Sequence, residues 1–325
     1  MQIYAVTFTC KEKAELLPVD PPDEDLRPND VTGRTLVSLI SPGTEINGGY
    51  LGSTFPRLPG YASVVEVTAV GAEVNDLAPG DCAFCQGRHQ SLFRGAREAF
   101  VPLPEGLEPE RAIFARLMGV TMATLTTTAA RPPEPVMVSG LGIVGLLGAQ
   151  IFRACGYDVF ACEPIGERRD IAFRKGIHSV FERAPLTDKA RAGRVGLALE
   201  CSGHEQAVLD ACRMVRKRGE VAMVGVPWQR RTELLAFDLL HVIFHKYVVL
   251  RSGWEWELSR QPEDFRANSI FGNYAAALQW LADGRVDVSG VYSRVSPSEA
   301  QQAYQDLLHH RGEEPAVVFD WRQLD

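Results

Sequence analysis

The feature that most constrains the fold is an alternation of apolar runs with helix-length segments, which begins after Pro132 and Pro133. Strands that alternate with helices form parallel sheets, because each connection must cross back over one face of the sheet. The sequence therefore predicts an α/β fold with a parallel sheet in its middle part. The expected strands are 136–139, 158–162, 177–181, 195–200, 220–226 and 247–250, and the expected helices are 143–155 and 271–282.

The first hundred residues have a different pattern, rich in β-branched residues, glycine and proline. Strand-like runs at 35–40, 63–70 and 99–103 are separated by turn sequences such as Ser41-Pro42-Gly43 and Pro79-Gly80-Asp81, which is typical of a mostly β lobe. The end of the chain holds a strand-like run at 290–295, a helix at 298–308 and a strand at 316–319, and we assign it to the same lobe. The expected domains are 1–121 with 286–325, and 122–285.

Charge and composition exclude several classes of function. The 325 residues carry a net charge of −7, which disfavours binding to nucleic acid or to anionic membranes. The N-terminus lacks the pattern of a signal peptide, and no apolar run approaches the length of a membrane span. Seven scattered cysteines, an odd number, fit reduced thiols in a cytoplasmic protein better than a disulfide framework.

A glycine pattern marks the expected binding site. Gly140, Gly142 and Gly145 form a G-x-G-x-x-G that follows an apolar strand and opens a helix. The three glycines allow a tight turn, close approach of a pyrophosphate and close helix–strand packing, while the helix N-terminus attracts the phosphates. The pattern in this context predicts a Rossmann-type dinucleotide site.

An acidic residue indicates which dinucleotide is bound. Glu163 ends the next expected strand, 23 positions after Gly140, where a carboxylate can accept both ribose hydroxyls of the adenosine half. The same carboxylate would repel a 2′-phosphate, so NAD is favoured over NADP. Arg168 and Arg169 lie close in sequence and could accommodate that phosphate, so NADP stays open.

Further motifs resemble the medium-chain dehydrogenase/reductase superfamily, which includes the zinc alcohol dehydrogenases. They are Ser41-Pro42-Gly43-Thr44-Glu45, Pro59-Gly60-Tyr61, Ala78-Pro79-Gly80-Asp81, Glu200-Cys201-Ser202-Gly203, Val224-Gly225-Val226-Pro227 and Asp283-Gly284-Arg285-Val286-Asp287. The resemblance implies a GroES-like β domain beside the Rossmann domain, an active site in the cleft between them, and a homodimer. It also implies cofactor contacts at Gly140, Gly142, Ile143, Val144, Gly145, Glu163, Arg168, Cys201, Ser202, Val224, Gly225, Val226, Thr121 and Ser252.

The chain departs from this superfamily where zinc-dependent members hold their metal. Pro42, Tyr61 and Leu117 stand at or near the three ligand positions, and none can replace a cysteine or histidine ligand. Cys82 and Cys85 form a lone pair, too few for a structural site. We therefore expect no zinc, as in a zinc-free branch of the superfamily that includes bacteriochlorophyllide dehydrogenase-like proteins.

Hydride transfer without zinc needs a side chain that moves a proton. The resemblance makes His89 the first candidate, against the alternative of a histidine on a surface loop. Tyr61 is the second, although its ring could simply fill the volume left by zinc, and Thr44 and Glu45 follow. Tyr50 and Arg88 are expected to shape the substrate pocket, and Trp254 to wall that pocket or to lie in a dimer interface.

Three functions fit this pattern. The first is an NAD-dependent oxidoreductase acting on a secondary alcohol/ketone pair, with a hydroxylated ring such as a sugar or cyclitol as a guess at the substrate. The second is an NADPH-dependent quinone or enone reductase, against which Glu163 argues. The third is a non-catalytic NAD-binding module, which His89, Tyr61 and Glu45 disfavour. The fold alone does not choose among them.

Overall fold

The computed structural model describes residues 2–22, 25–266, 268–312 and 314–324. Contacts divide the chain into two compact units. Unit 1 contains Met1–Arg116, Tyr274–Ala282 and Val288–Asp325, and unit 2 contains Leu117–Asn273 and Asp283–Asp287. The change between the units falls within two helices, α3 (Ala115–Thr127) and α8 (Ile270–Ala282).

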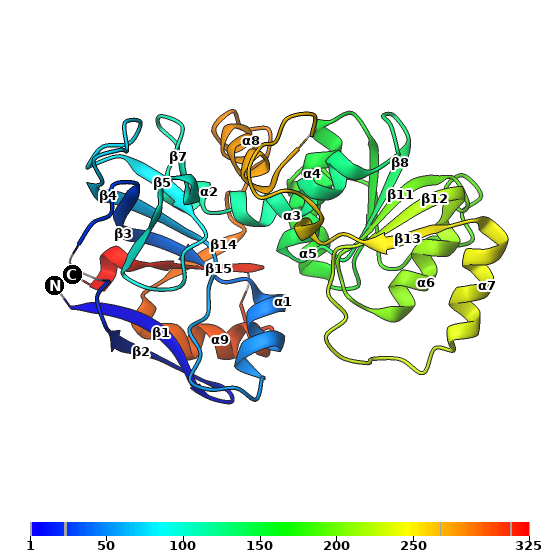
Figure 1. The fold of residues 1–325 in the computed structure, drawn as a ribbon. Coiled ribbons are helices and arrows are strands. Elements are labelled where there is room, and N and C mark those ends of the chain that lie inside the picture. Colours follow the sequence, from blue (N-terminus) through cyan, green and yellow to red (C-terminus); the bar gives the residue numbers. More distant parts are fainter. Residues whose placement is uncertain (1, 23–24, 267, 313, 325) are drawn as a thin grey trace. The chain divides into compact units, whose positions relative to one another are not determined.

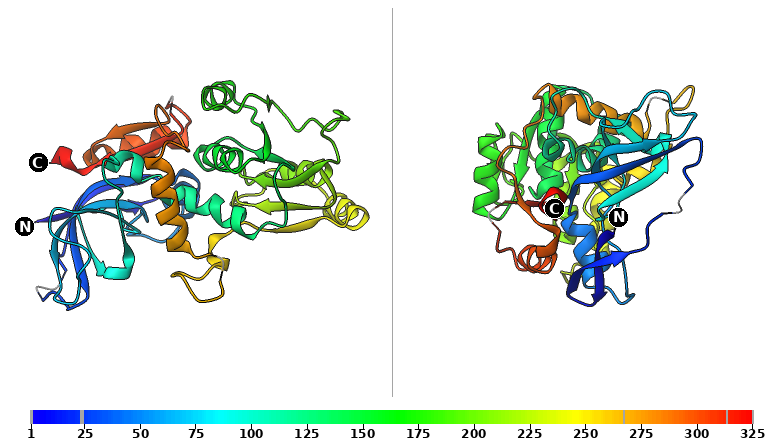
Figure 2. Two further views of the ribbon diagram at one scale, coloured as in Figure 1. Left: turned by 90° about the horizontal axis from the view of Figure 1, so that it is seen from above. Right: turned by 90° about the vertical axis from the view of Figure 1, so that its left-hand side faces the viewer.

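Unit 2 is built on a six-stranded parallel sheet in the order β10-β9-β8-β11-β12-β13. Its helices cover both faces, with α4 and α5 on one side and α6 and α7 on the other (Figures 1 and 2). The strands are β8 (Pro135–Ser139), β9 (Asp158–Cys162), β10 (Val180–Phe181), β11 (Val195–Glu200), β12 (Val215–Met223) and β13 (Val249–Ser252); the helices are α4 (Ile143–Ala154), α5 (Gly166–Arg174), α6 (Glu205–Met214) and α7 (Ala236–Lys246).

This strand order creates a switch point between β8 and β11. The chain moves outward from β8 through β9 to β10, and then returns to build β11, β12 and β13 on the other side of β8. Right-handed crossovers place the helices of the two halves on opposite faces. Ligands of such sheets bind beyond the carboxyl ends of the strands at the switch point, where the glycine-rich turn after β8 lies. The predicted parallel α/β sheet is confirmed.

Unit 1 is mostly β structure. Its main sheet has the order β14-β15-β3-β4-β5-β7, with β6 paired to β3, and β1 and β2 form a separate antiparallel hairpin. The strands are β1 (Ile3–Cys10), β2 (Lys13–Val19), β3 (Asp30–Leu39), β4 (Ser63–Val70), β5 (Cys82–Cys85), β6 (Leu92–Ala96), β7 (Phe100–Pro102), β14 (Tyr292–Val295) and β15 (Ala316–Asp320); the helices are α1 (Pro42–Glu45), α2 (Pro109–Ala112) and α9 (Ala300–Leu308).

An aromatic cluster forms part of the core of unit 1. The rings of Phe8, Tyr50 and Tyr304 are fully buried, and their centroids lie 4.8–5.3 Å apart. They come from β1, the turn after α1 and α9, so three segments distant in sequence meet here (Figure 1). Such aromatic pairs favour tilted and offset contacts at these separations.

The structure corrects several element boundaries. β3 begins at Asp30, five residues before the expected start, and β10 is limited to Val180–Phe181. β12 begins at Val215, five residues before the expected start, and ends at Met223. β13 begins at Val249, because Tyr247 ends α7 in the left-handed region with φ of 53° and cannot continue an extended strand. The β1–β2 hairpin and helices α5, α6 and α7 were not anticipated.

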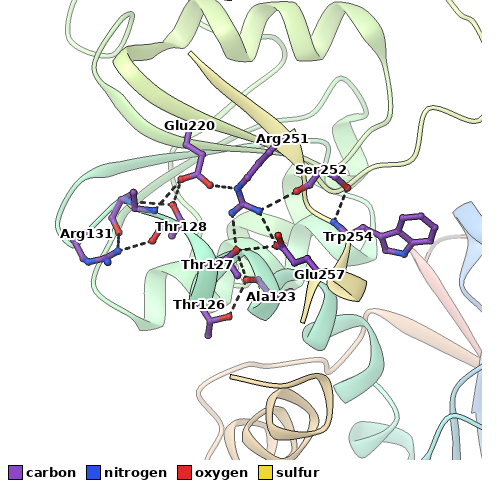
Figure 3. A network of polar contacts seen from close by, with 12 residues as sticks. Ala123, Thr126, Thr127, Thr128, Arg131, Glu220, Arg251, Ser252, Trp254 and Glu257 are labelled. Carbon is purple, nitrogen blue, oxygen red and sulfur yellow. Dashed lines mark hydrogen bonds and ion pairs between the residues drawn. The ribbon is translucent and has the colours of Figure 1, made fainter. Parts of the chain in front are cut away.

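A buried ion pair joins β12 and β13 in unit 2 (Figure 3). Arg251 Nε lies 2.5 Å from Glu220 Oε1, and Glu220 Oε2 accepts a hydrogen bond from the Thr128 hydroxyl at 2.7 Å. Arg251 also donates to Thr127 Oγ1 at 2.9 Å and to Glu257 at 3.1 Å. The network therefore ties the C-terminal end of α3 to the edge strand of the sheet.

We predict that Glu220→Ala lowers the free energy of unfolding by about 3 kcal/mol, because it leaves a mostly buried guanidinium with only the exposed carboxylate of Glu257 as partner and also removes the hydrogen bond to Thr128. Denaturant unfolding measures this loss. The control is Arg230→Gln, which removes an ion pair with Glu233 whose side chains are 70% and 89% exposed. The control should change stability by less than about 0.5 kcal/mol, and an equally small effect of Glu220→Ala would contradict the prediction.

Candidate functional site

The turn between β8 and α4 has the shape that a pyrophosphate requires. A Cβ added at Gly145 would lie 1.9 Å from the Gly140 carbonyl oxygen, so only glycine allows this packing. Gly140 has φ of +89°, which also favours glycine. A Cβ on Gly142 would meet nothing within 4 Å, and no side chain caps the N-terminus of α4. The open space and the helix N-terminus fit a bound phosphate.

Glu163 closes this turn from the end of β9. Its side chain is almost fully buried, and its two oxygens accept backbone hydrogen bonds from Leu141 at 2.7 Å and Ile165 at 3.0 Å. Arg168 lies 3.9 Å from the same carboxylate, and Arg169 donates to the Glu163 and Pro164 carbonyls instead. Each carboxylate oxygen keeps a further lone pair, so Glu163 can also accept ribose hydroxyls.

A second buried carboxylate, which sequence reasoning did not single out, organises the neighbouring loops. Glu200 ends β11 with no exposed surface, and its side chain accepts hydrogen bonds from Ser202 and from the backbone of Gly203. Burial raises the pKa of Glu200, while these hydrogen bonds lower it. A Cβ on Gly203 would lie 2.4 Å from the Val226 carbonyl oxygen, so the loop after β11 packs directly on the loop after β12. The feature of the sequence that could have identified Glu200 is an acidic residue at the end of a central strand.

The other residues expected at the cofactor vary in exposure. Ile143 is buried in the first turn of α4, Val144 is half-buried, and Val226 is exposed. Thr121 is fully buried in α3, where its hydroxyl donates to the Met118 carbonyl. Cys201 and Val224 are half-buried, and Ser252 is exposed at the end of β13.

Unit 1 contains a buried polar cluster around Glu45. Glu45 is 4% exposed, and its Oε1 accepts the Ser41 backbone N–H at 2.8 Å. Its Oε2 contacts His89 Nε2 at 2.9 Å and accepts a hydrogen bond from the Tyr304 hydroxyl. Every contact of this carboxylate therefore comes from a protein group, as a buried charge requires.

His89 lies inside this cluster. Its side chain has no exposed surface, which corrects the alternative of a surface-loop histidine. Nδ1 lies 2.8 Å from Ser38 Oγ, and Ser38 Oγ also accepts a hydrogen bond from Trp321 Nε1 at 2.9 Å. Since both ring nitrogens contact protein groups, His89 holds Glu45 in place and does not face solvent.

Tyr61 and Thr44 are only half-buried and lie beside this cluster. Burial raises the pKa of the Tyr61 phenol, while the charge of Arg116 and hydrogen bonds with Ser41 and Thr44 lower it. The pKa of Tyr61 is raised overall, so Tyr61 stays protonated at neutral pH and can donate a hydrogen bond or a proton.

Arg116, which sequence reasoning missed, carries no pattern that distinguishes it from other helix arginines.

The three residues assigned to the substrate pocket differ in their surroundings. Tyr50 belongs to the aromatic core, and its hydroxyl donates to the Glu12 carbonyl at 2.7 Å. Arg88 is exposed on the loop before His89. Trp254 is 65% exposed in unit 2, and its ring points away from the Glu220–Arg251 pair (Figure 3).

The residues at the superfamily's zinc positions do not fit a zinc ion. Pro42 and Leu117 offer no ligand atom, and the Tyr61 phenol, whose pKa is raised, stays neutral. Within residues 2–22, 25–266, 268–312 and 314–324, no group of three histidine, cysteine or acidic side chains could hold a metal ion. Burial raises the pKa of Cys85 to about 12, so this thiol also stays neutral.

Part of the chain matches a family model, and curated dehydrogenases match over most of its length. Residues 144–267 match the model of the zinc-binding dehydrogenase family. L-threonine 3-dehydrogenase of Streptomyces avermitilis is 27% identical over 96% of this chain and 98% of its own length. The probable D-xylulose reductase A of Aspergillus terreus is 24% identical over 79% of this chain and 80% of its own.

Solved structures share the fold. Galactitol-1-phosphate dehydrogenase from Escherichia coli superposes with a TM-score of 0.80 at 18% identity, over 98% of this chain and 99% of its own. An alcohol dehydrogenase from Thermus sp. ATN1 gives 0.77 at 23% identity with the same coverage. These solved structures show the fold that the chain shares with dehydrogenases. In the described part of the chain, no helix is long and apolar enough to cross a membrane.

We predict that Gly142→Ala abolishes NADH binding, measured by fluorescence titration, while the free energy of unfolding stays within about 1 kcal/mol of the wild type. The added methyl group would enter the open space where a pyrophosphate fits, and it meets no protein atom within 4 Å. A variant that is equally stable and binds NADH normally would show that the phosphates do not approach this glycine.

Proposed function

We propose that the protein is an NAD(H)-dependent oxidoreductase that interconverts a secondary alcohol and a ketone without zinc. The observation that carries the proposal is the glycine turn after β8, closed by the buried carboxylate of Glu163. A bound nicotinamide dinucleotide would supply or accept the hydride. The chain's own residues must hold the dinucleotide and move the proton of the substrate hydroxyl.

The position of Glu163 supports NAD over NADP. The carboxylate is fixed by two backbone N–H groups, so it cannot swing away from a ligand without losing both hydrogen bonds. A 2′-phosphate beside a fixed carboxylate would suffer charge repulsion, whereas two ribose hydroxyls can donate to it. Arg168, at 3.9 Å, would partly offset that repulsion.

Tyr61 is the group that we propose to donate the proton. His89 and Glu45 are enclosed and hydrogen-bonded within unit 1, whereas Tyr61 and Thr44 retain exposed surface. In reduction, the proton of the phenol would move to the substrate oxygen as the new C–H bond forms. Thr44, which shares a hydrogen bond with Tyr61, would help to orient the phenol.

The relatives support a hydroxylated small molecule as substrate, since their names include a threonine dehydrogenase, a xylulose reductase and a galactitol phosphate dehydrogenase. A sugar or cyclitol-like hydroxyl is consistent with these names. The cysteines are all free thiols, which supports the reducing cytoplasm as the location.

We predict that Glu163→Ala weakens NADH binding by at least tenfold more than NADPH binding, because the lost carboxylate accepts ribose hydroxyls and repels a 2′-phosphate. Fluorescence titration with each dinucleotide measures the ratio. Arg153→Ala is the control and should leave the ratio unchanged, since Arg153 lies in the last turn of α4 and donates to the Gly176 carbonyl. An NADPH preference in the wild type would favour a quinone or enone reductase instead.

We predict that Tyr61→Phe lowers kcat by 10²–10⁴-fold, the usual contribution of a general acid, with NADH affinity unchanged. Steady-state kinetics with a secondary ketone, found by screening sugars and polyol ketones, measures the loss. His89→Gln should lose activity in step with its loss of thermal stability, because His89 supports Glu45. Full turnover in Tyr61→Phe would remove Tyr61 from the role of proton donor.

We also propose a homodimer, formed through the outer edge of the unit 2 sheet. β13 is the last strand of the sheet order, and α7, which leads to it, has no buried residue. Leu240 and Phe244 of α7 are 63% and 77% exposed, and Val249 on β13 is 50% exposed. An apolar sheet edge of this kind is a ready site for pairing, and a second copy offers the same edge under two-fold symmetry.

We predict that Phe244→Glu with Val249→Glu yields a monomer in analytical ultracentrifugation, since two charges per chain would be buried in the interface. Phe173→Glu is the control, because Phe173 is 59% exposed on α5 in the other half of the sheet. A wild type that sediments as a monomer would refute the dimer.

A further inference from the structure

Arg116 brings a buried positive charge to Tyr61. The residue is 5% exposed, and its guanidinium carbon lies 4.6 Å from the centroid of the Tyr61 ring. The same guanidinium carbon lies 5.7 Å from the centroid of the Tyr274 ring. Tyr274 is fully buried, and its hydroxyl accepts a hydrogen bond from Gln86 at 2.8 Å. The two rings fix the guanidinium beside the phenol, because stacked arginine loses little further freedom.

The charged and titratable groups around Tyr61 come from several elements. Arg116 lies at the start of α3, Glu45 ends α1, and Tyr304 belongs to α9 and contacts Glu45 together with His89. Glu45 raises the pKa of Tyr61 and Arg116 lowers it. The guanidinium of Arg116 is therefore the cation placed to stabilise a negative charge at Tyr61, against the opposing effect of Glu45.

We propose that Arg116 supplies at this site the positive charge that zinc brings to metal-dependent relatives, by stabilising the phenolate that forms when Tyr61 gives up its proton. Arg116 stands next to Leu117 and over Tyr61, two residues at or near positions where the resemblance implies a zinc ligand in metal-dependent members. A fixed cation needs no reorganisation when charge develops, which is the condition for electrostatic catalysis. Arg116 is a positioning residue, since it acts through Tyr61.

This proton transfer rests on the proposed role of Tyr61. In reduction, the O–H bond of the phenol breaks and its proton forms the hydroxyl of the product alcohol. A bound reduced dinucleotide would supply the hydride to the carbonyl carbon and would be oxidised as the ketone is reduced. The phenolate is held beside the guanidinium until it regains a proton from solvent.

The test reads the ionisation of Tyr61 without substrate or dinucleotide. A fluorinated tyrosine is incorporated at position 61, so that the phenol titrates where the fold is stable, and ¹⁹F NMR follows its shift with pH. Arg116→Met should move the midpoint upward by about 1 pH unit or more. Arg116→Lys keeps a charge and should restore most of the wild-type value. Arg116→Gln is the second neutral variant if the methionine variant does not fold.

Arg111→Met is the matched control, because Arg111 precedes α3 and donates to the Leu281 carbonyl. It should leave the midpoint unchanged. An unchanged midpoint in the neutral Arg116 variants would overturn the proposal. A raised midpoint combined with full turnover in Tyr61→Phe would instead place the error in the proposed function, because the electrostatic pair would exist without serving proton transfer.

Discussion

Unit 1 depends on the compensation of one buried carboxylate. A charge as enclosed as Glu45 is tolerated only when protein groups replace water around it. Its partners come from the turn before α1, from the loop that holds His89 and from α9, and His89 extends the cluster to Ser38 on β3 and Trp321 after β15. This arrangement fixes the segment that carries Thr44, so a histidine with no exposed surface would still support the proposed site through Glu45.

Unit 2 contains two further buried carboxylates that are held by hydrogen bonds from protein groups. Glu163 and Glu200 end β9 and β11, and each carboxylate accepts backbone N–H groups of the loop beside it. These strands flank β8 in the sheet, so the two carboxylates brace the glycine turn and the loop after β11. Neutral side chains of similar size would accept fewer of these hydrogen bonds, and the loops would lose their fixed positions.

The local patterns of the sequence were reliable where one physical rule dominated. The tight turn at Gly140 and the close packing at Gly145 could be predicted from the glycine spacing, because a positive φ and the lack of room for a Cβ both demand glycine. The roles of Gly142 and Glu163 toward a dinucleotide stay predictions. His89 could not be placed, because a loop position says nothing about which elements cover it. Arg116 could not be identified from the sequence, because its proposed role depends on contacts with the rings of Tyr61 and Tyr274. These two residues lie 55 or more positions away in the sequence.

The central claim is hydride transfer without zinc, and metal content measured together with activity tests it most directly. The purified protein would be analysed for metal by mass spectrometry and assayed for NADH-dependent reduction of a ketone panel, before and after treatment with a chelator. The account predicts far less than one zinc per chain and activity that the chelator does not change. One zinc per chain, with activity lost on chelation and restored by added zinc, would contradict it.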